Sequence, residues 1–537
     1  MKKSIYAIVS AICLGIGATG CSDELDIPQK GVYETDKYYS NDEEAASALA
    51  LSMSYVNNMA FEIIESINCL SDDIWPGGSN SGDQPGLHQF SGFYISTEND
   101  KVKNIYSFCY RLIYFSNVLI ENIEGKPDAT PFMKQCVAES YFLRGWAEFY
   151  LGVLWGNPPI VDHVLQPEEY TSVKNSEYGA MLEQAAKDFR HAIETGDLPQ
   201  KASLGDRENL AHCTLAAAQG YLGKTYLFQK KYKEAHETLE QIIGSGKYAL
   251  YDGDYADIIK APSNWSDEGI FEINCPPNQT DATAPQLMSY VYIYAGWRED
   301  FFDFTNLAEP FKANFNTTGY GFFNPTGRLA EALIKSDGAD GYRTTSVVKD
   351  QDYVENVMGI AKKANAPAHG HGLYCGWKNR YEWSDVALNW GGWSPFPATN
   401  FRYMRYAEVL LSAAEAYLQD GNPAKALEYV NMVRARAKAP LYSAIDMDKI
   451  KLERQVELCM EGQRFMDLVR WGDAAQVLAT QGQNIEKLDI DANGKWILVP
   501  DDASSPTYGF KAGRNELLPY PQEELDQNPN IVQNPGY

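Results

Sequence analysis

The sequence predicts a mainly α-helical protein: a body of tetratricopeptide-like helical pairs with an irregular, loop-rich insert that carries a few short strands. Apolar residues that recur at intervals of three and four along several long stretches predict the body. Between about 250 and 400, glycine, proline, asparagine and tryptophan are dense and apolar runs are short, which predicts the insert. We therefore assign 41–250 and 400–537 to the body and 251–399 to the insert.

Three single helices are expected before residue 160. Apolar residues recur at helical spacing over 45–60, 102–123 and 131–154. Pro158 and Pro159 follow the third stretch, and proline lacks the amide hydrogen that a helix interior needs. We therefore expect the third helix to end before these prolines.

Two further stretches predict helical pairs of the tetratricopeptide kind. Residues 209–243 and 403–436 each place small residues where two helices would cross and aromatic residues beside them. Gly421-Asn422-Pro423 supplies the turn of the second pair. One such pair cannot bury its own apolar face, so several must stack. We expect 131–195 and 451–480 to supply further members.

Residues 1–20 predict a secretory signal peptide. Two lysines precede an apolar run over 5–16, and small residues then lead to Cys21. A cysteine at this place is what lipoprotein processing requires, so we expect Cys21 to carry the lipid and 21–40 to form an anchor and polar tether. No later stretch is apolar enough to span a bilayer. The alternative is an ordinary signal peptide followed by a coincidental cysteine.

The charge balance argues against some classes of partner. The chain has 46 lysines and arginines against 72 aspartates and glutamates, which gives a formal net charge of −26 at pH 7. Nucleic acids and anionic lipid surfaces bind basic patches, so neither is expected as a partner. The chain also has nine cysteines. Seven of them follow the leader without a C-x-x-C spacing, which favours buried thiols over a zinc or disulfide framework.

Two motifs imitate metal sites, and neither has the necessary ligands. His369-Gly370-His371 lacks a paired carboxylate, and its glycine-rich setting favours a mobile loop. Residues 489–494 resemble the start of a calcium loop, but Pro500 stands where the bidentate glutamate is required. An Asn-Gly turn is the better interpretation of 489–494. We expect no metal and no cofactor.

A run of arginines and carboxylates near the carboxyl end predicts a structural brace. Its members lie three or four residues apart, which is the spacing of ion pairs on a helix surface: Arg454, Glu457, Glu461, Arg464, Asp467 and Arg470. The catalytic alternative needs two carboxylates that face each other across a cleft and have separated pKa values. Because cations alternate with the carboxylates here, we assign no catalytic residue.

Several motifs occur together along the chain. They are 138–145 with Gly156-Asn157-Pro158-Pro159, 324–326 with Asp337-Gly338 and Arg343, 402–411 with 414–416 and 431–437, 457–472 around Glu461-Gly462-Gln463-Arg464-Phe465, and 518–537 around Leu518-Pro519-Tyr520-Pro521. In this order, and after a lipoprotein-type leader, they resemble the SusD/RagB family of outer-membrane nutrient-binding lipoproteins.

The resemblance implies a lipid-anchored place on the cell surface, as a lid on a SusC-like TonB-dependent outer-membrane transporter. It also implies a ligand that is an oligosaccharide or polysaccharide, or in some members a peptide, and no catalysis. A tetratricopeptide-type adaptor that binds only protein would explain the helices, but neither the leader nor the aromatic-rich insert. A surface glycosidase is the third class of function.

A sugar site needs aromatic rings for the flat C–H faces of its ligand and polar groups for the hydroxyls. Two segments offer both, and in the family, loops in comparable places build an aromatic platform. The first segment, 72–84, offers Asp73, Trp75 and Asn80.

The second segment alternates with period two over 290–294, which predicts a strand with three tyrosines on one face. Its candidate binding residues are Tyr290, Tyr292, Tyr294, Trp297 and Arg298. The alternative for both segments is that the rings pack inward. Further candidates are Trp377, Trp383, Trp390 and Trp393.

Overall fold

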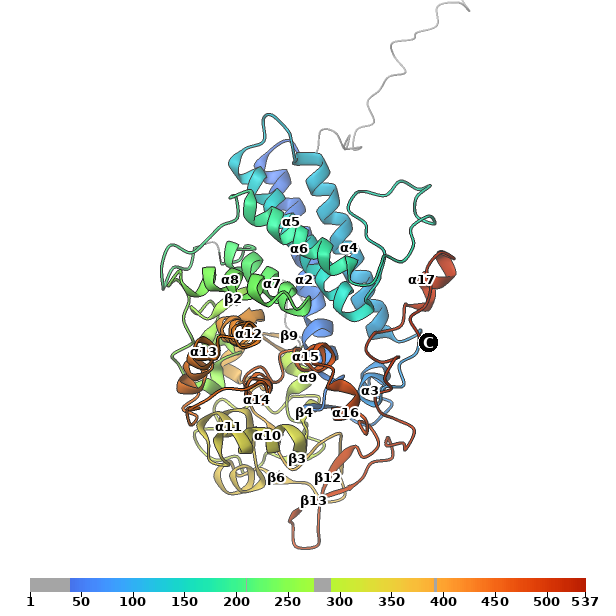
Figure 1. Cartoon of the computed structure of the whole chain (residues 1–537). Helices are drawn as coiled ribbons and strands as arrows, with labels where there is room; N and C mark the ends of the chain where they lie inside the picture. The colour runs from blue at the N-terminus through green and yellow to red at the C-terminus, as the bar shows by residue number, and fades with distance from the viewer. Residues whose placement is uncertain (1–38, 209, 275–290, 391–393) are drawn as a thin grey trace, which may run out of the picture.

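The computed structural model describes residues 39–208, 210–274, 291–390 and 394–537 (Figure 1). In this view, long helices form the upper part of the molecule, shorter helical pairs the middle, and the loops and short strands of the insert the lower part. The predicted fold class is confirmed. The leader, the predicted lipidation site Cys21 and Tyr290 lie outside the described residues.

The upper part contains α2 (Asp42–Ala60), α4 (Asp100–Ile123), α5 (Pro131–Trp155) and α6 (Ala180–Glu194). The three predicted single helices are confirmed as α2, α4 and α5. Side chains cap their first turns: Asn41 accepts a hydrogen bond from the amide of Glu44, and Thr130 accepts one from the amide of Met133. Helix α5 ends at Trp155. The next residue, Gly156, adopts a φ of +78°, which glycine does freely, two residues before the prolines.

The predicted tetratricopeptide-like pairs are α7 (Leu215–Phe228) with α8 (Tyr232–Ile243), and α12 (Tyr406–Gln419) with α13 (Pro423–Arg436). Helices α7 and α8 pack closely at Gly223, where a Cβ atom would lie 2.5 Å from the Leu239 side chain. Asn422 caps α13, and Pro423 occupies its first position, where the missing amide hydrogen costs nothing. Helices α8 and α12 contact each other, so the two pairs form one stack.

The predicted member 131–195 is α5 packed against α6. Three helices follow the second pair: α14 (Met447–Glu457), α15 (Arg464–Trp471) and α16 (Ala474–Val477). The other helices and helical turns are η1 (Phe61–Ser66), α3 (Pro85–Gly92), η2 (Tyr255–Asp257), η3 (Ala261–Ser263), α9 (Val291–Ala295), α10 (Gly327–Asp337), α11 (Tyr342–Val347), η5 (Tyr353–Val357), η6 (Trp383–Asp385) and α17 (Gln522–Gln527).

Short antiparallel strands join distant parts of the chain. The two-stranded pairs are β1 (Ile74–Gly77) with β4 (Phe322–Pro325), β2 (Gly269–Ile273) with β11 (Phe401–Arg405), β3 (Phe302–Asp303) with β6 (Ala361–Lys362), β5 (Val348–Lys349) with β8 (Cys375–Gly376), and β9 (Val386–Trp390) with β10 (Ser394–Pro397). A three-stranded sheet has the order β13 (Trp496–Pro500), β12 (Glu486–Ile490), β7 (Ala368–His369). The predicted Asn-Gly turn is confirmed, because it connects β12 to β13 with Gly494 at φ +81°.

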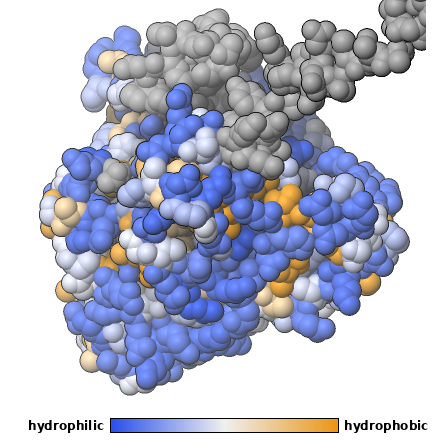
Figure 2. Space-filling model, turned by 90° about the horizontal axis from the view of Figure 1, so that it is seen from above, coloured by the Kyte–Doolittle hydropathy of each residue, from blue (hydrophilic) through white to orange (hydrophobic). Residues whose placement is uncertain are grey.

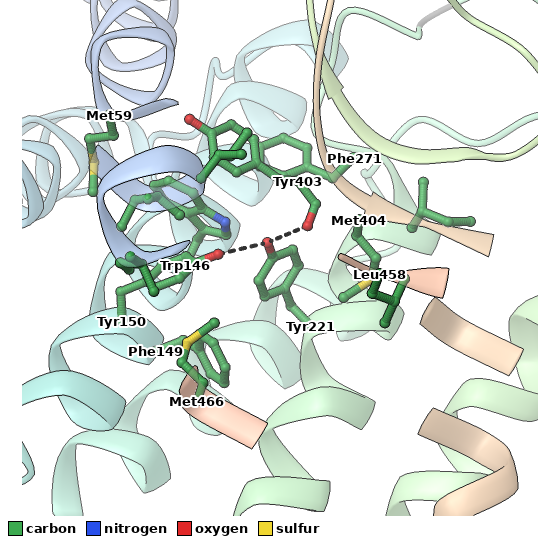
Figure 3. Close-up of a cluster of buried hydrophobic side chains, with 14 of the residues drawn as sticks. Met59, Trp146, Phe149, Tyr150, Tyr221, Phe271, Tyr403, Met404, Leu458 and Met466 are labelled. Atoms are coloured by element: carbon green, nitrogen blue, oxygen red, sulfur yellow. Dashed lines mark hydrogen bonds between the residues drawn. The ribbon is translucent and has the colours of Figure 1, made fainter. Parts of the chain in front are cut away.

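The main core lies between the upper helices, the helical pairs and sheet β2–β11 (Figure 3). Trp146 and Tyr150 of α5 meet Tyr221 of α7, Phe271 of β2 and Tyr403 of β11. The Tyr150 and Tyr221 hydroxyls are 3.5 Å apart, and the Tyr221 hydroxyl donates to the Tyr403 carbonyl. The buried hydroxyls of Tyr150 and Tyr221 therefore lie within hydrogen-bond reach of each other and of the backbone.

A second, smaller core holds the insert together. Trp297 packs there with Phe302, Phe315 and Trp377, and Trp496 of β13 joins them from the carboxyl-terminal part. The expected buried thiols are confirmed for the described cysteines, which are free and buried: Cys69, Cys109, Cys136, Cys213, Cys375 and Cys459.

Two local predictions are wrong. Residues 291–295 form the short helix α9 instead of a strand, so period-two alternation over five residues did not decide the backbone there. The predicted ion-pair ladder is not one helix surface, because α14 ends at Glu457 and α15 begins at Arg464. Between them, Gly462 adopts φ +75°, where a Cβ atom would lie 2.5 Å from the Ile63 carbonyl oxygen.

The surface agrees with the acidic, polar composition. Seen from above, hydrophilic residues cover most of the face that is shown, and hydrophobic residues gather in a few patches between them (Figure 2). Among the described residues, no helix combines the length and the apolar character that crossing a membrane requires.

Candidate functional site

The two predicted ligand-binding segments meet in the structure. Strand β1 pairs with β4, and the amide of Gly78 donates to the carbonyl of Gly321 at 2.9 Å. The Gln84 side-chain amide then donates to the Tyr294 hydroxyl at 3.3 Å. Segment 72–84 therefore lies beside α9, although more than 200 residues separate them in the sequence.

Tyr294 is the centre of an aromatic cluster at this junction. Its ring centroid lies 4.9 Å from that of Phe61, 5.1 Å from Phe322 and 5.5 Å from Tyr320. Phe323 packs beneath at 6.2 Å. We call these five residues the Tyr294 cluster. Phe322 and Phe323 are buried, whereas Phe61, Tyr294 and Tyr320 are half-buried and reach the surface.

Polar side chains surround the Tyr294 cluster. Gln84 contacts Tyr294 directly, and the Arg298 guanidinium donates to the Tyr320 carbonyl at 3.3 Å while pairing with Asp300 at 2.6 Å. The Lys101 ammonium lies 5.1 Å from the centre of the Phe61 ring. Half-buried rings beside amide and charged groups can contact the C–H faces and the hydroxyls of a sugar at the same time.

A glycine turn fixes the loop that carries Gln84. Gly77 adopts φ +75°, and a Cβ atom there would lie 2.3 Å from the Gly321 carbonyl oxygen. After it, the Asp83 carboxylate accepts hydrogen bonds from the Ser79 amide and hydroxyl. Asn80 is exposed, and its side-chain oxygen accepts from the Gly82 amide at 2.8 Å. Asn80 therefore shapes the loop and keeps its amide nitrogen near the surface.

The other two candidates in segment 72–84 face inward. Trp75 is only 6% exposed, and its indole nitrogen donates to Glu486 at 2.9 Å. Asp73 is buried and accepts a hydrogen bond from Gln455 at 2.6 Å. Burial and the neighbouring Asp72 raise the pKa of Asp73. The expectation that Trp75 offers an exposed stacking face is wrong, and the alternative of inward packing holds for it.

Trp297 is likewise part of the core. It is 4% exposed, and its indole nitrogen donates to the Gly376 carbonyl at 2.9 Å. The side chain of Tyr292 and the whole of Tyr290 lie outside what the structure describes, as do the side chain of Trp390 and the whole of Trp393. Of the remaining candidates, Trp377 is buried and Trp383 is half-buried. Segment 290–298 therefore contributes Tyr294 and Arg298 to the described surface.

The predicted brace is a buried network of ion pairs between separate elements. Glu457 lies among three guanidinium groups: Arg343 at 3.0 Å, Arg405 at 3.2 Å and Arg436. Burial opposes the ionisation of Glu457, but these cations outweigh it and lower its pKa to about 2. Arg464, the first residue of α15, likewise pairs with a residue outside its own helix, Asp72, at 2.8 Å. These carboxylates hold separate elements together.

The histidine motif also has structural contacts. His369 lies in β7, not in the predicted mobile loop, and its ring contacts Asp501 at 3.0 Å. His371 is buried, which lowers its pKa to about 4. In the described part of the chain, no group of three or more histidine, cysteine, aspartate or glutamate side chains is placed to hold a metal ion.

Phe61 and Tyr320 belong to the Tyr294 cluster but were not singled out in the sequence. Phe61 continues an apolar helical run, and Tyr320 stands in a glycine-rich stretch, so both resemble ordinary structural residues. Their role depends on the pairing of β1 with β4, which has no local signal.

Two family models match the chain. The model of the SusD family matches residues 349–537, and a model described as "Starch-binding associating with outer membrane" matches residues 82–227. The chain belongs to the SusD/RagB family. A SusD-like protein of Bacteroides ovatus is 22% identical to this family member over 600 residues, which cover 100% of this chain and 98% of the relative. SusD-like protein P2 of Formosa agariphila is 23% identical over 578 residues, which cover 100% of both.

Solved structures share this SusD-like fold. A laminarin-binding SusD-like protein has a TM-score of 0.77 and 26% identity, and the match covers 93% of this chain and 100% of that one. Surface glycan-binding protein A from Bacteroides thetaiotaomicron, solved in complex with laminarihexaose, has a TM-score of 0.70 and 22% identity over 92% of this chain and 99% of its own.

Proposed function

We propose that this protein is a non-catalytic, cell-surface lipoprotein that binds an oligosaccharide or polysaccharide at the Tyr294 cluster and passes it to a SusC-like TonB-dependent transporter. The Tyr294 cluster carries the proposal, because half-buried rings and polar groups from separate segments meet there. The rings would stack on the C–H faces of the sugars, while Gln84, Asn80 and Arg298 would bond their hydroxyls.

The relatives support a glycan as the ligand. One solved structure of the same fold is described as laminarin-binding, and another was solved with laminarihexaose. Laminarin is therefore the first polysaccharide to test. A peptide ligand is the competing outcome within the same family.

The anchor and the transporter are the parts of the proposal that rest on the family and on the leader. A family model described as associating with the outer membrane matches the chain, and Cys21 stands where lipoprotein processing attaches a lipid. Helix α2 begins at Asp42, so about 20 residues separate it from the lipid. Fully extended, that tether would reach at most ~70 Å. It would let the folded body sit over a transporter in the same membrane.

The test of glycan binding is affinity electrophoresis of residues 22–537 in gels that contain laminarin or other polysaccharides. We expect retardation in at least one gel, and Tyr294→Ala should weaken it about tenfold or more. Tyr114→Ala is the matched control, because Tyr114 is a 48% exposed tyrosine on the body helix α4. Retardation unchanged by Tyr294→Ala would remove the Tyr294 cluster from the proposal.

Two further readouts separate the competing classes of function. Incubation with each retarding polysaccharide should release no reducing ends, and their steady release would identify a glycosidase. Copurification with a barrel transporter, without affinity for any glycan, would favour a peptide ligand or a protein adaptor.

A further inference from the structure

A second pair of aromatic rings lies at the surface, outside the Tyr294 cluster. Tyr94 and Tyr508 are stacked in parallel, with their ring centroids 4.3 Å apart and their planes 14° apart. Tyr94 is nevertheless 40% exposed. Tyr94 therefore remains accessible to solvent although Tyr508 covers one face of its ring.

The protein holds this tyrosine pair rigidly. A Cβ atom at Gly92 would lie 2.7 Å from the Tyr94 ring and 2.9 Å from the Tyr508 ring, so only glycine fits beneath the two rings. The Gly509 amide donates to the Gly92 carbonyl at 3.0 Å, and the Gln483 side-chain amide donates to the Tyr508 carbonyl at 2.8 Å. The exposed Tyr94 ring is thus preorganised, which reduces the entropy lost when a ligand binds.

Helix α3 connects the tyrosine pair to the Tyr294 cluster. Gln84, which contacts Tyr294, immediately precedes this helix, and Gly92 ends it. Eight residues at 1.5 Å rise make α3 ~12 Å long. Tyr94 therefore lies about one length of α3 beyond Gln84. A glycan of several sugar units could reach from one aromatic group to the other.

We propose that the stacked pair Tyr94–Tyr508 is a second sugar-stacking subsite, at which the exposed Tyr94 ring binds a pyranose ring of the same glycan chain that occupies the Tyr294 cluster. This inference rests on the proposed function. The ligand is a neutral or weakly charged glycan, because a tyrosine face contacts the C–H groups of a sugar ring and needs no charge. With this subsite, affinity depends on the length of the glycan. A short oligosaccharide occupies only the Tyr294 cluster, and a longer one occupies both the Tyr294 cluster and the tyrosine pair.

The test is titration calorimetry of wild type, Tyr94→Ala, Tyr94→Phe and Tyr508→Ala with a length series of the oligosaccharides that bind, laminarin fragments first. Tyr94→Ala should weaken binding of long oligosaccharides about tenfold and leave short ones unchanged. Tyr94→Phe keeps the ring and should bind like wild type. Tyr508→Ala removes the ring on which Tyr94 stacks. It should weaken the binding of long oligosaccharides less than Tyr94→Ala does. The melting temperature of each variant confirms that it is folded.

The outcomes separate this inference from the proposed function. If wild type binds no glycan of any length, both are overturned. If wild type binds and Tyr94→Ala binds long oligosaccharides equally well, the second subsite is overturned and the Tyr294 cluster is not. An equal loss for short and long oligosaccharides would also overturn it, because Tyr94 would then belong to the first site.

Discussion

The ion pairs of the helical body and the Trp377 ring of the insert accommodate buried cations in different ways. In the body, arginines bond to carboxylates: Arg144 pairs with Asp188 at 2.5 Å, and Arg454 pairs with Asp467 at 2.8 Å. In the insert, three cations gather around one ring. The Trp377 ring centre lies 3.9 Å from the guanidinium carbon of Arg380, and the ammonium nitrogens lie 4.9 Å and 5.6 Å away for Lys349 and Lys260.

The consequence for ionisation is opposite in the two regions. Burial and the neighbouring Arg380 lower the pKa of Lys260 to about 8, because a ring face compensates an ammonium less than a carboxylate does. Burial also opposes the ionisation of Glu457, yet the surrounding arginines lower its pKa to about 2. Glu457 and the arginines around it therefore stay charged over the neutral range, whereas Lys260 beside the Trp377 ring titrates at its upper edge.

The largest effect is expected from breaking the network of the body. Arg405 bonds Glu461 at 2.7 Å and Glu457 at 3.2 Å, and it also contacts Glu268. Arg405→Met leaves these buried carboxylates without their main partner and should lower the free energy of unfolding by ~3–5 kcal/mol in urea denaturation. As control, Lys425→Met removes an exposed pair with Glu428 and should cost less than about 0.5 kcal/mol. Equal losses in both variants would contradict the contrast between buried and exposed pairs.

The second prediction separates the core of the insert from its surface. Trp297→Ala should destabilise the protein by ~3–5 kcal/mol, because the ring is buried in the second core, with glycan affinity per folded molecule unchanged. Tyr294→Ala should cause a large loss of affinity and, because Tyr294 is only half-buried, a smaller loss of stability than Trp297→Ala. Thermal unfolding and titration calorimetry of both variants measure this. A Trp297→Ala protein that melts normally but binds poorly would show that this ring reaches the ligand.

The third prediction concerns pH. Lys260 has a pKa of about 8 in the folded protein and 10.5 as its ordinary value, so the unfolded chain binds more protons between these values. Stability contributed by Lys260 should therefore rise as the pH increases from 8 to 10.5, by on the order of 1–3 kcal/mol. Lys260→Met should flatten this part of the pH profile of the unfolding free energy. If the pH profiles of the unfolding free energy are parallel in the variant and wild type, the folded protein does not lower the pKa of Lys260.

The smallest effect tests whether a positive φ costs the same free energy at a glycine of the insert side and at a glycine of the body. Gly494 in the β12–β13 turn has φ +81°, and Gly125 after α4 has φ +77°; a Cβ atom added at either glycine would meet nothing within 4 Å. Replacing either with alanine should cost about 1 kcal/mol, because the strain is local. Urea midpoints of the two variants should agree. A much larger cost at Gly494 would mean that this turn supports the second core beyond its own strain.

The sequence predicted the body well because helices leave local signals. Periodicity located α2, α4 and α5, and Pro158 and Pro159 limited the end of α5. Periodicity failed where tertiary contacts decide the secondary structure. The alternation at 290–294 is too short to exclude a helix, and α9 packs against the β4 aromatic residues instead of joining a sheet.

The candidate site was predicted by segment but not by residue. Composition located the two loops, yet it could not tell Trp75 and Trp297, which face inward, from Tyr294, which reaches the surface. Tyr94 and Tyr508 stack although more than 400 residues separate them in the sequence. Pairings between such distant residues have no local pattern to reveal them.

Residues 518–534 close one side of the main core. The Trp155 indole donates to the Pro519 carbonyl, the Asn534 side chain bonds to the Trp155 and Leu518 carbonyls, and Arg464 reaches back to Asp72. A chain made from its amino end therefore cannot complete the packing around Trp155 until residues 519 and 534 have been made. Contacts of such long sequence separation also slow folding. The helices that contact these residues therefore stay incompletely packed for much of the time that the chain is being made.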